Sequence, residues 1–238
     1  MAAKKVALID LDGTLLPMDT AAFMRAFLAH VGQCCAAALG MAPAELSDKM
    51  GQAVSAMVNG SNPHSSNADS FWAGFERVSG KDRPLAESIL AQYYQGEFSA
   101  LRSLCGQQPL AGALLRGLAE QGYELVLATN PIFPRIAIEK RLRWAGIAPE
   151  EFVLISHYEN CHSAKPDQAY YLELLHERRA TPRATLMIGN HVFDDILPAN
   201  NVGMRCYFLT DCAINPHSCP RHVARGDFRM LLRWVEAL

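Results

Sequence analysis

Hydrophobic and polar positions divide the chain into three stretches of different pattern. Residues 5–16 begin with a short apolar run and continue with polar residues, which predicts a buried strand and its loop. Apolar residues recur at helical spacing through most of 17–108, so this stretch is predicted to be almost wholly helical. Its first helix is expected to be capped by Asp19 or Thr20, and Asn59–Ser70 is an expected loop, because it is rich in Gly, Pro, Ser and Asn.

The third stretch, 109–238, alternates helical patterns with short apolar runs. Such runs are typical of strands that are buried on both faces, and their alternation with helices predicts a parallel sheet. The runs are YELVLAT, EFVLIS, ATLMIG and MRCYFL. We therefore expect an α/β fold: a Rossmann-like parallel sheet with helices on both faces, and an all-helical domain inserted after the first strand. The core domain is predicted over 1–16 and 109–238, and the helical domain over 17–108.

Composition restricts the classes of partner. The chain has 238 residues, of which 50% are hydrophobic and 19% charged, with a net charge of -2. There is no basic excess, so we expect no nucleic-acid partner, and no apolar run is long enough for a signal core or a bilayer span. The seven cysteines have no CxxC spacing and predict free thiols in a reducing compartment. A cytoplasmic protein is the expectation.

Polar side chains follow the predicted strands at the point where each strand ends. In open parallel sheets, ligands bind beyond the carboxyl ends of the strands, so residues from separate segments are expected to meet there. The candidates are Asp10 and Asp12 after the first strand, Thr129 and Asn130 after the second, Lys165 in the loop after the third, and Asn190, Asp194 and Asp195 after the fourth.

These residue types suit phosphoryl transfer. A carboxylate can attack phosphorus and form an acyl phosphate, which divides a slow hydrolysis into two easier steps. A divalent cation lets that carboxylate approach an anionic phosphate and removes the repulsion between two neighbouring aspartates. A second carboxylate can protonate the leaving oxygen and then activate water. The Thr129 hydroxyl and the Lys165 ammonium would hold the phosphate oxygens.

Four segments together resemble the motifs of the haloacid dehalogenase superfamily. DLDGTLL resembles the first motif, LATN the second, SAKPD the third, and IGNHVFDDILPANNVGM the fourth. They occur in the family's order and at similar distances across nearly the whole chain. All four in register form a far more specific signal than the first motif alone.

The resemblance implies roles for individual residues. Asp10 would be the nucleophile and a Mg²⁺ ligand, and Asp12 the acid/base, with its main-chain carbonyl also on the metal. The implied phosphate-binding residues are Asp10, Gly13, Thr129, Asn130 and Lys165, and the implied metal ligands are Asp10, Asp12, Asn190, Asp194 and Asp195. The helical insertion resembles the family's α-helical cap of the first type, which closes over small phosphorylated metabolites.

One position departs from the family pattern. Asn190 stands where the first acidic residue of the fourth motif is usual, and its amide oxygen brings no negative charge. Asp194 or Asp195 could compensate, and Asp195 fits the family's spacing best; His191 is more often a surface or supporting residue. Asp19, Thr20 and Phe23 lie near the expected site, where substrate contact and helix capping are both open.

The function expected from these features is a magnesium-dependent phosphatase that acts on a small phosphomonoester through an aspartyl-phosphate intermediate. Two alternatives stay open. One is a phosphomutase, which would share every core residue. The other is a catalytically weak or inactive protein that binds phosphometabolites or regulates, an alternative suggested by Asn190. The sequence gives no indication of the physiological substrate or of the oligomeric state.

Overall fold

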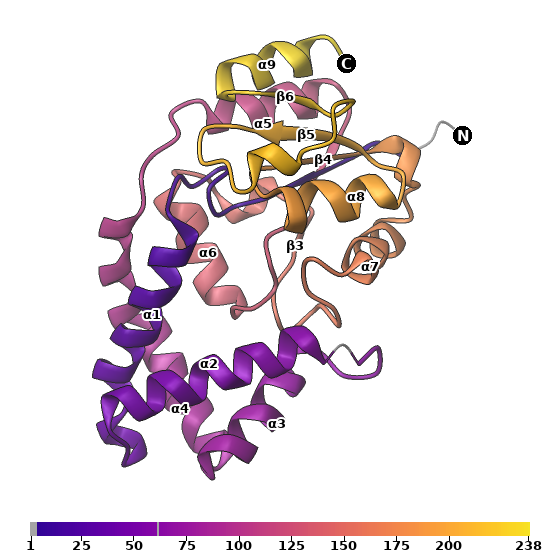
Figure 1. Ribbon diagram of the computed structural model, residues 1–238. Helices are drawn as coiled ribbons and strands as arrows, with labels where there is room; N and C mark the ends of the chain where they lie inside the picture. The colour runs from indigo at the N-terminus through magenta and orange to yellow at the C-terminus, as the bar shows by residue number, and fades with distance from the viewer. Residues whose placement is uncertain (1–3, 61) are drawn as a thin grey trace.

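The computed structural model of the protein describes residues 4–60 and 62–238, and these form a helix-covered sheet and a separate group of helices (Figure 1). The first three residues of the predicted core segment 1–16, and Ser61 in the predicted loop, lie outside the described residues. None of the helices described is long and apolar enough to cross a membrane.

The sheet has six strands in the order β3-β2-β1-β4-β5-β6, and every neighbouring pair is parallel. Its strands are β1 Val6–Ile9, β2 Glu124–Leu127, β3 Leu154–Ile155, β4 Thr185–Gly189, β5 Arg205–Leu209 and β6 Ala224–Gly226. After β1 the chain adds β2 and β3 on one side, and then crosses to β4 on the other side. The strand order therefore reverses between β1 and β4, which is where open α/β sheets form a binding crevice.

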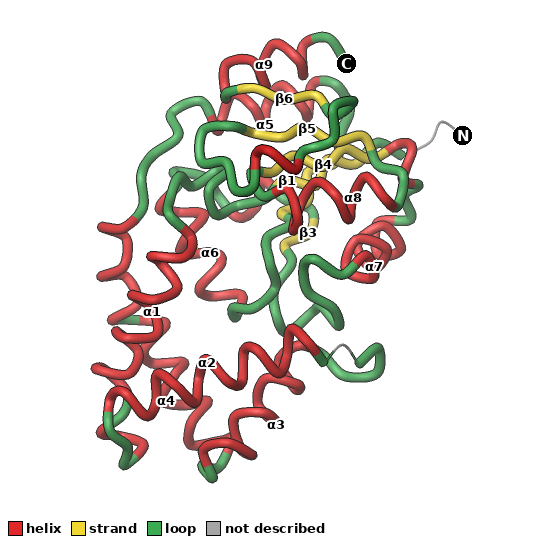
Figure 2. The backbone as a smooth tube through the Cα atoms, viewed as in Figure 1, coloured by secondary structure: helices red, strands yellow, loops and turns green. Residues whose placement is uncertain are grey.

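Helices cover both faces of this sheet, as the sequence predicted (Figure 2). Side chains alternate along β1: Ala7 and Ile9 belong to one apolar cluster, and Val6 and Leu8 to another. The first cluster is completed by α5 Ala111–Glu120, α6 Arg135–Trp144 and α9 Phe228–Glu236. The second is completed by α7 Gln168–Arg178 and α8 Leu197–Asn201. The Rossmann-like fold is confirmed.

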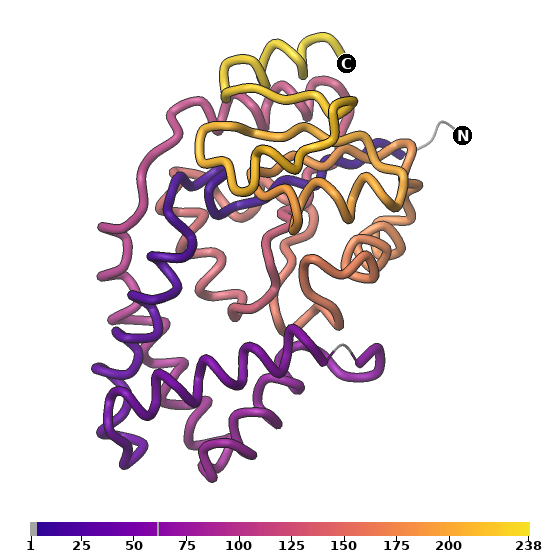
Figure 3. Tube along the Cα trace, viewed as in Figure 1, coloured from indigo at the N-terminus to yellow at the C-terminus, as the bar shows by residue number. Residues whose placement is uncertain are grey.

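The group of helices between β1 and α5 is the helical unit. It comprises α1 Thr20–Cys35, α2 Pro43–Asn59, α3 Asn67–Ser79 and α4 Arg83–Gln95, with the 3₁₀ segments η1 Ala37–Leu39 and η2 Glu97–Leu104. Asp19 caps α1, because its Oδ1 accepts a hydrogen bond of 2.9 Å from the main-chain N–H of Ala22. The segments entering and leaving the unit run side by side, where the N–H of Gly106 donates to the carbonyl of Pro17 at 2.7 Å (Figure 3).

The helical unit is attached to the sheet-bearing part by apolar and polar contacts. The ring of Phe27 lies 4.9 Å from that of Phe133, and the ring of Phe98 lies 5.2 Å from that of Trp144 (centroid distances). Elsewhere the N–H of Asn67 donates to the carbonyl of Cys161 at 2.8 Å. One apolar cluster extends from the helical unit to a face of the sheet, so the division into 1–16, 17–108 and 109–238 remains a prediction.

The sequence pattern differs from the structure at the edges of the sheet. The run EFVLIS yields only the two-residue strand β3, which lies at an edge and pairs with β2 alone. At the other edge, neither β6 nor the following α9 was predicted; the three residues of β6 give too short a pattern. The helical pattern between the runs ATLMIG and MRCYFL begins as a π-helical turn, η5 Val192–Ile196, before the short α8 Leu197–Asn201.

Candidate active site

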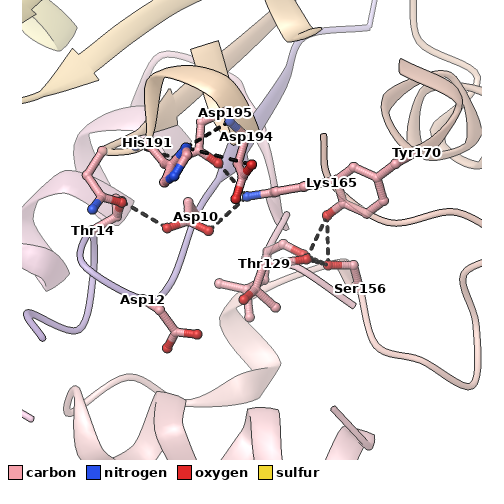
Figure 4. Close-up of polar contacts among 12 residues, drawn as sticks. Asp10, Asp12, Thr14, Thr129, Ser156, Lys165, Tyr170, His191, Asp194 and Asp195 are labelled. Carbon is pink, nitrogen blue, oxygen red and sulfur yellow. Dashed lines mark hydrogen bonds and ion pairs between the residues drawn. The ribbon is translucent and has the colours of Figure 1, made fainter. Parts of the chain in front are cut away.

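The site is built around Asp10, which directly follows β1 and is only 6% exposed. Both of its carboxylate oxygens have partners (Figure 4). Lys165 Nζ lies 2.8 Å from Oδ1, and the Thr14 hydroxyl donates to Oδ2 at 3.1 Å. The end of β1, the turn after it and the loop before α7 therefore meet at one carboxylate, as the sequence predicted for Asp10 and Lys165.

Lys165 also contacts the fourth motif. Its Nζ lies 2.5 Å from Asp195 Oδ1, and the other oxygen of Asp195 accepts from the main-chain N–H of His191 at 2.9 Å. A Cβ on residue 189 would lie 2.3 Å from Asp195 Oδ2, so only glycine permits this approach. Lys165 and Asp195 are almost fully buried. One ammonium group is thus held between two carboxylates.

Burial dominates the ionisation of this cluster. Burial raises the pKa of Asp10 to about 6, although the Lys165 ammonium opposes the shift; the Asp195 charge adds to it. For Lys165, burial alone would lower the pKa, but the attraction of Asp10 and Asp195 outweighs it and raises the pKa well above its ordinary value. Lys165 therefore remains an ammonium ion at neutral pH.

Thr129 and Asn130 follow β2 and border the same cavity as Asp10. The main-chain carbonyl of Thr129 accepts from the hydroxyls of Ser156 at 2.8 Å and Tyr170 at 2.9 Å. These contacts fix the backbone that presents the Thr129 hydroxyl. Ser156 and Tyr170 were not among the predicted residues, since a Ser after β3 and a Tyr on α7 have no distinctive spacing.

Asn190 is bonded through both ends of its amide. Its Oδ1 lies 3.1 Å from the Thr14 hydroxyl, whose single proton is shared between this oxygen and Asp10 Oδ2, and its Nδ2 donates to the carbonyl of Cys212 at 2.6 Å. A carboxylate here would oppose the Cys212 carbonyl, which gives a structural reason for an amide at this position. Gly13 has φ of +84°, and a Cβ on it would lie 2.3 Å from Asn190 Nδ2, so close packing requires this glycine.

Asp194 and His191 lie beside this amide. His191 Nδ1 accepts from the main-chain N–H of Asp194 at 2.9 Å and so caps the η5 turn. The Asp194 carbonyl accepts from the Tyr171 hydroxyl, while its carboxylate is partly exposed and borders the cavity. His191 therefore supports the η5 turn, in line with the sequence-based expectation of a supporting residue.

Asp12 points away from the Asp10 carboxylate (Figure 4). It forms an ion pair with Arg141 of α6, whose side chain is 0% exposed. Burial raises the pKa of Asp12, and the Arg141 charge acts in the opposite direction. Sequence reasoning missed Arg141. The available signal was its place among Ala137, Ile138 and Leu142, the buried positions of α6, where a charged residue is unusual.

All the predicted catalytic residues border one cavity of about 380 Å³ between the sheet edge and the helical unit. Thr20 and Phe23 line it too, whereas Asp19 does not, so of these three only Asp19 is accounted for by capping. The polar lining residues are Asp10, Asp12, Thr20, Thr129, Asn130, Arg141, Lys165, Asn190, His191, Asp194 and Asp195; the apolar ones are Met18, Ala21, Phe23, Met24, Ile132, Phe133 and Ile214.

The donor set around Asp10 fits a magnesium ion that shares its coordination with a ligand. Mg²⁺ commonly takes one or two carboxylates together with phosphate oxygens and water. Asp10, Asn190 and Asp194 present oxygens at the cavity, and no described residue donates a hydrogen bond to the Asp12 carbonyl. Asp195 borders the cavity too, and both of its oxygens accept hydrogen bonds, as both oxygens of Asp10 do. Within 4–60 and 62–238, no three His, Cys, Asp or Glu side chains are placed to hold a metal by themselves.

Comparison with known proteins identifies the family of the chain. The model of the family described as haloacid dehalogenase-like hydrolase matches residues 7–209, a range that includes all the predicted catalytic, phosphate-binding and metal-binding residues. The chain belongs to the haloacid dehalogenase-like hydrolase family. No curated protein matches it significantly.

Solved structures similar to this hydrolase include both phosphatases and dehalogenases. A HAD phosphatase from Thermococcus onnurineus is 18% identical, with 98% of this chain and 97% of that chain covered and a TM-score of 0.58. A 2-haloacid dehalogenase from Pseudomonas syringae pv. Tomato is 23% identical, with 98% of each covered and a TM-score of 0.61. A predicted phosphoglycolate phosphatase from Haemophilus somnus is 19% identical, with 98% and 99% covered and a TM-score of 0.56. At these identities the likeness shows the shared fold.

Proposed function

We propose that this hydrolase is a magnesium-dependent phosphatase that hydrolyses a small phosphomonoester through an aspartyl-phosphate intermediate. The observation behind the proposal is the pair of carboxylates after β1. Asp10 is held by Lys165 and Thr14 at the sheet edge, while Asp12 borders the same cavity in a different environment. Two carboxylates with separate partners can take separate roles, one as nucleophile and one as acid/base.

In the first step, a carboxylate oxygen of Asp10 forms a bond to phosphorus, and the bond from phosphorus to the alcohol oxygen breaks. The leaving oxygen takes a proton from Asp12, which becomes a carboxylate. Lys165 and Thr129 would hold the phosphoryl oxygens in place and stabilise the charge that develops on them. Asp10 must be ionised to attack, so this step requires a pH above its pKa of about 6 unless a bound cation lowers that value.

In the second step, Asp12 accepts a proton from a water molecule whose oxygen attacks the same phosphorus. The bond between phosphorus and Asp10 breaks, which releases phosphate, restores the Asp10 carboxylate and leaves Asp12 protonated for the next cycle. Asp10, Asn190, Asp194, Asp195 and the Asp12 carbonyl would hold Mg²⁺, which when bound neutralises phosphate charge and so allows an anionic nucleophile to approach. A cytoplasmic location is part of this proposal.

Hydrolysis of p-nitrophenyl phosphate and acetyl phosphate, with Mg²⁺ and with EDTA, tests the proposal. We expect turnover with Mg²⁺, little with EDTA, and a loss of roughly 10⁴-fold or more in Asp10→Asn. Asp48→Asn, on the exposed side of α2, is the matched control and should retain activity. Turnover by Asp10→Asn equal to that of the control would contradict an aspartyl-phosphate route.

Asn190 also favours a second candidate, a protein on this scaffold that binds phosphometabolites and turns them over weakly or not at all. A neutral amide in place of a carboxylate lowers the negative charge available to a cation. Absence of turnover across a broad phosphometabolite panel, together with calorimetric binding of a panel member, would support it. Chloride release from 2-chloropropionate would instead indicate a dehalogenase, for which the acid/base Asp12 has no role.

A further inference from the structure

The cavity contains a buried cation whose hydrogen-bonding capacity is largely unused. Arg141 is 0% exposed and borders the cavity, and its Nη1 donates to Asp12 Oδ2. Among the described residues, its Nε and Nη2 have no hydrogen-bond partner. Asp12 Oδ1 has none either. Buried donors of a charged group without a partner are costly, so this arrangement is explained most simply if a ligand completes it.

Packing accounts for the faces of this guanidinium group but not for its edge. Its carbon lies 4.4 Å from the ring centroid of Phe133 and 5.9 Å from that of Phe23. Cation–π contacts of this kind stabilise the planar faces. The N–H groups lie in the plane, and Nε and Nη2 together form the side fork that matches a carboxylate or phosphate through two parallel hydrogen bonds.

The position of Arg141 assigns the fork to one part of the substrate. The transferred phosphoryl group belongs beside Asp10, Lys165 and Thr129. Asp12, as the acid that protonates the leaving oxygen, belongs beside the alcohol part, and Arg141 is bonded to Asp12. A group bound by the free fork would therefore be carried by the alcohol, a short distance from the ester oxygen.

We propose that Arg141 binds a second anionic group, on the alcohol part of the substrate, and that the enzyme consequently prefers phosphomonoesters of acidic alcohols. This inference rests on the proposed function and names its substrate class. The cavity of about 380 Å³ is of the size that small ligands occupy, and apolar side chains such as Met24 and Ile132 line it between the polar groups. A carboxylate and a second phosphate share the chemistry that the fork recognises.

Pairs of substrates that differ only in this group test the inference. 2-Phospholactate is compared with isopropyl phosphate, and 3-phosphooxypropanoate with propyl phosphate, because each pair replaces a carboxylate by a methyl group. Ethylene glycol bisphosphate supplies a second phosphate instead. For the wild-type enzyme, we expect kcat/KM to be about 30-fold or more higher for at least one acidic substrate than for the substrate that has a methyl group in place of the acid. A bidentate contact with a charged group typically has an effect of this size. Whether the favoured substrate carries a carboxylate or a second phosphate identifies the anionic group that Arg141 binds.

The variants Arg141→Gln and Arg141→Lys connect the preference to this side chain. We expect the ratio of kcat/KM between the acidic and the neutral substrate of a pair to fall close to one in Arg141→Gln. In Arg141→Lys it should fall to an intermediate value, because a lysine keeps the charge but lacks the two parallel N–H donors. Binding to Asp10→Asn and to Asp10→Asn/Arg141→Gln, measured by calorimetry, gives a readout that does not need turnover. Circular dichroism establishes whether each variant is folded.

The outcomes separate this inference from the proposed function. Equal kcat/KM within every pair, or an undiminished ratio in folded Arg141→Gln, overturns the inference and leaves the phosphatase intact. No turnover of any phosphomonoester, with tighter Arg141-dependent binding of the acidic members, overturns the phosphatase and supports the inference. If Arg141→Gln does not fold, two measurements without that variant still test the inference: the kcat/KM ratios of the wild-type enzyme and the affinities of Asp10→Asn for the paired substrates. Equal values for the acidic and the neutral member of each pair would overturn the inference.

Discussion

Two buried cations, Lys165 and Arg141, border the same cavity but differ in how completely they are bonded. Lys165 lies between the carboxylates of Asp10 and Asp195, and each of those carboxylates has a further donor. Arg141 has one carboxylate partner, and two of its nitrogens and one oxygen of that partner have none among the described residues. The Lys165 side is organised before any ligand binds, whereas the Arg141 side is arranged for a ligand to complete.

The largest effect on stability should follow from removal of Lys165. Lys165→Met leaves Asp10 and Asp195 buried without their common counter-ion, which typically costs about 3–5 kcal/mol of unfolding free energy. Loss of a donor to the phosphoryl oxygens should also lower kcat by roughly 10³-fold. Urea denaturation and steady-state kinetics measure the two effects. Lys49→Met on α2 is the control, and equal stability of the two variants would show that Lys165 is not needed to balance the buried charges.

The pH dependence of stability tests the Lys165 side through Asp10. Its pKa is about 6 in the folded chain and 3.8 in the unfolded chain, so the folded state holds this proton more tightly. Stability should therefore fall as pH rises from 4 to 6 and then level off, by about 3 kcal/mol in total. Asp10→Asn lacks this contribution. In EDTA, its unfolding free energy relative to wild type should rise by about 2 kcal/mol of that total between pH 4 and pH 7; a constant difference would contradict the assignment.

On the other side, Asp12→Asn should separate catalysis from stability. The amide oxygen still accepts from Arg141, but the side chain can no longer transfer a proton, so we expect kcat to fall by about 100-fold or more. The unfolding free energy should change by less than in Lys165→Met, because Asp12 is partly exposed. Equal kcat in Asp12→Asn and wild type would exclude Asp12 as the acid/base.

The smallest effect is expected at the edge of the Lys165 side. Tyr170→Phe removes the hydroxyl that donates to the Thr129 carbonyl while Ser156 keeps its own bond to that carbonyl. The stability should decrease by about 1 kcal/mol. If the hydroxyl also positions Thr129, KM for phosphate esters should rise a few-fold while the pH profile stays unchanged. Tyr123→Phe, away from the cavity, serves as the control.

The sequence predicted the fold because local and global signals agree in its central part. The strands β1, β2, β4 and β5 are buried on both faces and appear as continuous apolar runs, with helical patterns between them. Polar residues after these strands must meet at one edge once the sheet is parallel. This topology is why Asp10, Thr129, Lys165 and Asn190 could be placed together without coordinates.

Arg141 could not be placed in the same way. It lies inside a helix, not at the end of a strand, so no rule of sheet topology directs it to the site. Its contact with Asp12 depends on how α6 packs against the sheet beside the loop that follows β1, and the spacing of 129 residues between the two contains no information about that packing. The hydrogen bond from the Asn190 amide to Cys212 could not be predicted from the sequence either, since the acceptor is a main-chain carbonyl.

The contacts that attach the helical unit have a consequence for motion. Phe27 and Phe98 are packed against Phe133 and Trp144, and Asn67 is tied to Cys161 at another point of the boundary. A rigid-body swing of the whole unit would have to separate aromatic rings and hydrogen bonds together. We therefore expect ligands to enter and leave through rearrangement of a few residues near Met18, Ala21 and Ile214, which line both the site cavity and a second hollow. By the same contacts, the helices and the sheet should melt as one cooperative body.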